Sequence, residues 1–91
     1  MFVRNRFDPG TIVITRAANA VLPQKDVLRG LFRHLSGDWG ELCDADWQEN
    51  ELALMESLRL FSSYVTAEGI KFWLITEHDR SVTTILLPSD Y

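Results

Sequence analysis

The chain has 91 residues, of which 46% are hydrophobic and 24% charged, and its net charge at neutral pH is −4. This composition is typical of one small folded domain and excludes collagen-like, coiled-coil and intrinsically disordered chains. No apolar run is long enough to span a bilayer, and the N-terminal residues lack the apolar stretch of a signal peptide. The single cysteine, Cys43, cannot form an internal disulfide, so we expect a cytoplasmic protein without membrane contact.

The first predicted element is a short strand over residues 11–15, a β-branched run that follows the turn signal at Pro9. The Ala-rich residues 16–22 allow one or two helical turns. Residues 26–35 form the first clear helix, because apolar residues recur there at helical spacing and Gly37 follows as a stop signal. Whether residues 1–10 are ordered stays open.

A second helix is predicted over residues 45–57, and one of its faces is apolar apart from Glu51: it carries Trp47, Glu51, Leu54, Met55 and Leu58. After this helix the apolar period changes from 3.6 to 2. Three strands follow, over residues 60–66, 70–77 and 82–87, joined by loops short enough for hairpins. The sequence therefore predicts a single α+β domain: an N-terminal strand, two helices on one face of the sheet, and a three-stranded antiparallel meander.

Charge is strongly segregated along the chain. Residues 1–36 carry six basic and two acidic groups, whereas residues 37–58 carry seven acidic groups and no basic one. The sequence pI near 5 argues against nucleic acid as a direct ligand, because counterion release needs clustered lysine and arginine. The two segments either neutralise each other or are solvated, or the acidic one imitates a phosphate backbone and occupies a DNA-binding protein.

Two surfaces are candidates for binding a partner protein. One is a basic stripe on the first helix, since Lys25, Arg29 and Arg33 follow one another at four-residue spacing. The other is the acidic segment with its turn tryptophan. Tryptophan is favoured at binding hot spots, although a tryptophan in such a turn can equally close the end of a core. The predicted residues of this second surface are Trp39, Glu49 and Glu56.

A hairpin near the C-terminus gathers a histidine, an arginine, acids and hydroxyl groups. A metal-free ribonuclease needs a base for the 2′-hydroxyl group, a cation for the developing phosphorane charge and an acid for the leaving oxygen. The residues that would serve these roles are Tyr64, Lys71, Glu77, His78, Arg80 and Thr84. The alternative is a purely structural hairpin in which Asp79 and Ser81 make turn hydrogen bonds and Arg80 pairs with Glu77 or Asp79.

We expect neither a metal ion nor another cofactor. A zinc site built from His34, Cys43 and Asp44 would match no standard ligand spacing, and Cys43 is better explained as a small, partly buried apolar residue. The acidic residues lack the alternating pattern and the glycine of a calcium loop.

Residues from about 26 to 91 resemble a family of short bacterial proteins. The resemblance rests on two blocks: Gly37-Asp38-Trp39-Gly40, and the pattern W-x-I-T-E-x-D-R-S-x-T-T-x-L-L-P that runs from Trp73 to Pro88. Members of the family are labelled hypothetical or plasmid-related and often occur on mobile elements. The resemblance implies a small bacterial protein that stands alone. It implies no activity and no site residue.

The sequence favours a non-enzymatic accessory protein that acts by binding another macromolecule. A small metal-independent ribonuclease and a dimeric structural module are the alternatives. In the dimer, an exposed sheet edge at residues 82–87 or 11–15 would pair with its twin.

Overall fold

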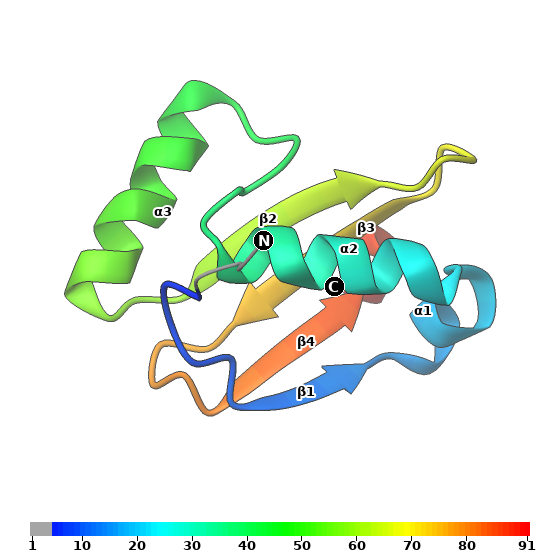
Figure 1. Ribbon diagram of the computed structural model, residues 1–91, viewed down its shortest axis with the longest axis horizontal. Coiled ribbons are helices and arrows are strands. Elements are labelled where there is room, and N and C mark those ends of the chain that lie inside the picture. The colour runs from blue at the N-terminus through cyan, green and yellow to red at the C-terminus, as the bar shows by residue number, and fades with distance from the viewer. Residues whose placement is uncertain (1–4) are drawn as a thin grey trace.

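The computed structural model describes residues 5–91, which form one sheet with helices on one face and beside one edge (Figure 1). The elements in chain order are β1 (Thr11–Ile14), α1 (Arg16–Val21), α2 (Gln24–Leu35), α3 (Asp44–Glu56), β2 (Leu60–Val65), β3 (Lys71–Thr76), β4 (Val82–Leu86) and the short 3-10 helix η1 (Pro88–Asp90). Among residues 5–91, no helix has both the length and the apolar character needed to cross a membrane.

The sheet has four strands in the order β1-β4-β3-β2. β2, β3 and β4 form an antiparallel meander, whereas β1 pairs in parallel with β4, from Thr11 opposite Val82 to Ile14 opposite Ile85. The α+β class is therefore confirmed. The expected two helices and antiparallel meander are corrected to three α-helices and a mixed sheet, because β1 adds to the meander as a fourth, parallel strand. β4 is consequently an internal strand and not a sheet edge.

The main core lies between the sheet and α1 and α2. Alternate residues of β3 face the helices, so Phe72 and Leu74 are buried there while Trp73 faces the opposite side. Gly30 allows α2 to approach closely, since a Cβ atom at this position would lie 2.8 Å from a ring carbon of Phe72. The helices α1 and α2 thus cover one face of the sheet (Figure 1). Among residues 5–91 the opposite face carries no α-helix, but η1 lies against β3 there and Tyr91 packs on the ring of Trp73.

A second core cluster joins α3 to the edge of β2 around the buried Trp39, Ala53 and Leu60. Trp47 and Leu54 of α3 pack against this cluster, as the apolar spacing predicts, whereas Met55 is 84% exposed. Asn50 takes the central place instead: its side-chain amide accepts a hydrogen bond from the backbone N–H of Phe61 and donates one to the carbonyl of the same residue.

The outer edge of β2 is covered by the turn that precedes α3. Ser63 donates its backbone N–H to the carbonyl of Trp39 at 3.2 Å and accepts the N–H of Glu41 at 2.7 Å. Gly40, between them, has a φ of +77°. The N-terminal segment also contacts this region, through Phe7. Of the residues 1–10 whose order the sequence leaves open, residues 1–4 lie outside the described part of the chain.

Replacing Gly40 with alanine tests this close approach. The new Cβ atom would collide with the carbonyl oxygen of Ser63, so we expect the free energy of unfolding to fall by about 3 kcal/mol. Gly69→Ala is the matched control, since Gly69 has a φ of +89° but nothing within 4 Å of the added atom, and it should cost about 1 kcal/mol. Equal losses in urea unfolding would show that the Ser63 contact is unimportant.

Candidate functional site

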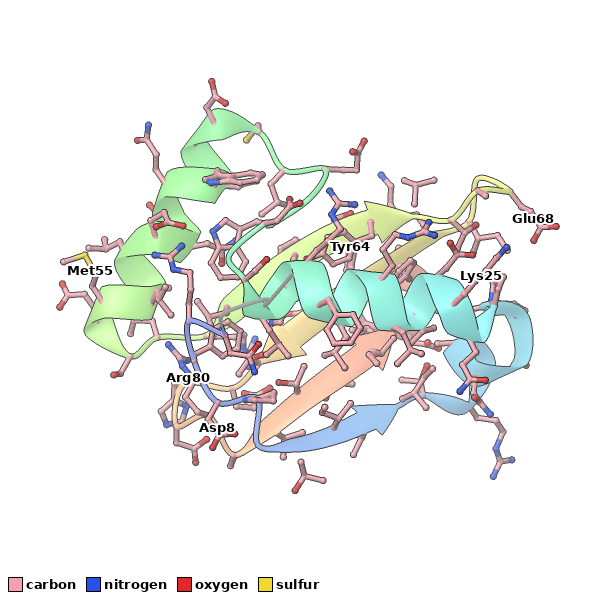
Figure 2. The ribbon with its side chains drawn as sticks, viewed as in Figure 1. Asp8, Lys25, Met55, Tyr64, Glu68 and Arg80 are labelled. Carbon is pink, nitrogen blue, oxygen red and sulfur yellow. The ribbon has the colours of Figure 1, made fainter. Side chains whose placement is uncertain are left out.

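The six residues of the hypothetical ribonuclease site do not come together. Tyr64 and Lys71 lie near one end of the sheet, while the loop with His78 and Arg80 lies at the other end; Figure 2 shows Tyr64 and Arg80 well separated. Tyr64 also faces the helices, where its hydroxyl group donates to the carbonyl of Asp38 at 2.7 Å, whereas Thr84 lies on the opposite sheet face. The expected catalytic cluster is therefore corrected to separate structural positions.

Arg80 stabilises the C-terminal end of α3. Its guanidinium group donates to the carbonyl oxygens of Ala53 at 3.2 Å and Leu58 at 2.7 Å, which lie in the last turn of the helix and just after it. Partial burial lowers the pKa of this group below its usual range. Glu77, the second charged residue of the hairpin, lies 3.5 Å from Arg59. Asp79 accepts hydrogen bonds from the backbone N–H and the hydroxyl group of Ser81, as the structural alternative predicts.

The basic stripe is largely engaged within the molecule. Arg33 forms two hydrogen bonds to Asp38, at 2.8 and 3.2 Å, and its guanidinium carbon lies 4.8 Å from the ring centre of Tyr64. The Arg33 hydrogen bonds hold the pKa of Asp38 below its usual value. Arg29 lies 3.6 Å from Asp26, so Lys25 is the one residue of the basic stripe that has no ion pair with a described residue.

Trp39 is not part of an exposed surface, because its side chain is 0% exposed. Its indole N–H donates to Glu51 at 2.8 Å, and the same carboxylate accepts two hydrogen bonds of 2.9 Å from Arg6. These contacts keep the pKa of Glu51 below its usual value. The ring packs against those of Phe7 and His34, so Trp39 closes the second core cluster, as the alternative interpretation of this tryptophan holds.

The largest free group of charges lies on α3. Glu49 and Glu56 are exposed, as predicted, and neither forms an ion pair with a described residue. Leu52, 48% exposed, and Met55, 84% exposed, lie on the same side of the helix at three- and four-residue spacing. Figure 2 shows Met55 pointing away from the body of the molecule. We call these four residues the outer face of α3.

Sequence reasoning missed Leu52 and Met55 as surface residues. It assigned Met55 to the packed face because apolar residues usually face the core. The residue that could have indicated the packed side is Asn50. Its side-chain amide hydrogen-bonds to both the N–H and the carbonyl group of Phe61 in β2, and this contact helps to decide which side of α3 faces β2.

A chain of buried polar groups runs from α2 through the sheet. His34, on α2, contacts the hydroxyl groups of Ser62 and Thr76, the latter at 2.8 Å; Thr76 lies 2.7 Å from Thr83, which donates to the carbonyl of Pro9. Each hydroxyl group has one hydrogen. Thr83 uses its hydrogen on Pro9, so Thr76 donates to Thr83, and Nε2 of His34 must be the protonated nitrogen that donates to Thr76.

The role of this network is structural, because its four side chains are fully buried and a substrate could not reach them. Burial lowers the pKa of His34 to about 3. Residues 5–91 contain no cluster of three or more histidine, cysteine or acidic residues that could hold a metal ion, and Cys43 is exposed instead of partly buried.

Comparisons of the chain with protein-family models, curated proteins and solved structures find no match. The resemblance to short bacterial proteins of mobile elements therefore stays a prediction, and the surfaces described above carry the functional conclusion.

The buried His34 predicts a loss of stability in mild acid. The unfolded chain takes up a proton near pH 6.5, whereas the folded state resists it down to a pKa of about 3, so stability falls as the pH falls through this window. Between about pH 7.5 and pH 5, above the range of most carboxyl groups, His34 should remove about 2 kcal/mol from the free energy of unfolding.

Urea unfolding at a series of pH values measures this effect. His34→Gln should flatten the pH dependence in that window, while His78→Gln, at an exposed position, should keep that of the natural chain. A His34→Gln variant with an unchanged pH dependence would contradict the assignment.

Proposed function

We propose that this protein is a non-enzymatic bacterial accessory protein that binds a basic partner protein in the cytoplasm through the outer face of α3. The observation that carries the proposal is the combination of free acidic groups and exposed apolar side chains on one helix face: Glu49 and Glu56 beside Leu52 and Met55. Charged residues alone would be an ordinary solvated surface, but a methionine that is 84% exposed next to a half-exposed leucine is not.

The position of α3 supports this use. The helix packs on the edge of β2 and stands beside the sheet, so its outer face is open to a groove of another protein (Figure 1). Asp44 and Asp46 add negative charge at its first turn, and its last turn contains no basic residue. A partner with a basic rim around an apolar groove would match this pattern, and the charges would also speed the encounter.

The ribonuclease alternative has less support, because its candidate residues lie at two ends and on two faces of the sheet and Arg80 is engaged with carbonyl groups. A nucleic-acid ligand has less support than a protein, because Arg6 and Arg33 are paired with acids and the net charge is −4.

Charge reversal on the outer face tests the proposal. Glu49→Lys and Glu56→Lys, singly and together, should reduce capture of a protein from nuclease-treated bacterial lysate, with the double variant losing at least tenfold in bound partner. The bound protein is measured by quantitative mass spectrometry, and far-UV circular dichroism checks that each variant keeps its fold.

Glu68→Lys is the matched control, because Glu68 is an exposed acid in the β2–β3 hairpin, far from α3 (Figure 2). Capture should be unchanged in this variant. If no protein is retained by the natural chain, or if the reversal variants retain it as well as Glu68→Lys does, the outer face of α3 is not the binding surface.

A further inference from the structure

The two edges of the sheet differ in how they are protected. At the β2 edge, the backbone of Ser63 is paired with Trp39 and Glu41, and α3 lies alongside. At the other edge, β1 pairs only with β4, and no element of residues 5–91 lies beyond it (Figure 1). Exposed edges are usually blocked by lysine, proline or a bulge, yet β1 is Thr-Ile-Val-Ile. This edge is therefore open to a further strand.

The hydrogen bonds of β1 to β4 show which backbone groups are free. The N–H groups of Thr11 and Thr15 bond to the carbonyls of Ser81 and Ile85. In a parallel ladder alternate residues bond to the same neighbour, so Ile12 and Ile14 direct their N–H and C=O groups away from β4. The free N–H and C=O groups of Ile12 and Ile14 lie symmetrically on either side of Val13. A two-fold axis at Val13 would therefore place Ile12 of one copy opposite Ile14 of the other.

An apolar groove lies beside this edge, on the helix side of the sheet. It has a volume of about 520 Å³, and none of its lining side chains is charged. Leu28 of α2 faces it and is 44% exposed; Phe32, one turn further along, is 54% exposed. In β1, Ile12 is 44% exposed. Strand edge and helix side chains thus form one largely apolar surface that the rest of residues 5–91 leaves uncovered.

The charges around β1 favour a second copy of this chain as the occupant. β1 contains no charge, so pairing with itself brings no like charges together, whereas the acidic outer face of α3 would repel its twin. Asp8 precedes the strand and Arg16 follows it, and both are exposed. An antiparallel arrangement places Arg16 of one copy towards the partner's Asp8, while a parallel arrangement would oppose equal charges.

We propose that two copies of this chain associate through antiparallel pairing of their β1 strands about a two-fold axis at Val13, which joins the two sheets into one of eight strands. Ile12 of each copy pairs with the partner's Ile14, giving four backbone hydrogen bonds. Leu28 and Phe32 of the two α2 helices close over the junction. The interface is isologous, as in most homodimers, and lies at the opposite edge of the sheet from α3.

The oligomeric state provides the first test. Sedimentation equilibrium of the full chain over a wide concentration range should show the mass of two chains, and Ile12→Lys should reduce it to the mass of one. Val65→Lys is the control: Val65 is also 44% exposed and ends the opposite edge strand, so this variant should remain a dimer. Circular dichroism confirms that both variants are folded.

A cysteine on the two-fold axis tests the register, independently of the lysine variants. In a Cys43→Ser background, Val13→Cys should form a disulfide-linked dimer on mild oxidation, because cross-strand Cβ atoms at such a pair lie about 4.5–5.5 Å apart. Thr11→Cys should not, since the two Thr11 positions would be about 13 Å apart along the strands.

A natural chain that is monomeric at every concentration would overturn the proposal. So would a dimer that survives Ile12→Lys, a dimer broken by Val65→Lys alone, or cross-linking at position 11 and not at position 13.

Discussion

The buried side chain of His34 joins the helical layer to the sheet, and the arrangement of the domain depends on it. Its two ring nitrogens contact residues of β2 and β3, and the hydrogen-bond chain continues through β4 to the carbonyl of Pro9, just before β1. Every donor in this chain has one acceptor, so loss of any member would leave a buried polar group without a partner. The network therefore holds α2 in one position over all four strands.

Three arginines also connect separate segments of the described chain. Arg6 ties the N-terminal segment to α3, Arg33 ties α2 to the turn that follows it, and Arg80 ties the last hairpin to the end of α3. Two basic residues of the first third of the chain, Arg6 and Arg33, thus form ion pairs with acids of the segment 37–58. The acids of this segment that form no ion pair with a described residue include Glu49 and Glu56, on the outer face of α3.

Local patterns predicted the local structure well, and contacts between distant segments decided the rest. Alternation and helical spacing located all four strands and the two long helices, because those signals lie within a few residues. They could not show that β1 joins β4, a pairing over 71 positions, or that Asn50 pairs with the backbone of Phe61 while Met55 stays exposed. For the site, Glu49 and Glu56 were predicted as surface acids, whereas the sequence left two interpretations of Trp39 because its partner, Glu51, lies on another element.

The pairing of β1 with β4 also has a consequence for how the protein is made. Thr11 has its partner, Val82, only after 71 further residues have been added, which takes roughly 4 to 14 s on a ribosome. During this time β1 and the apolar side of α2 have no sheet to pack against, and their apolar side chains stay open to other chains. The late pairing of β1 therefore exposes the N-terminal elements to aggregation for as long as the strands that cover them are being made.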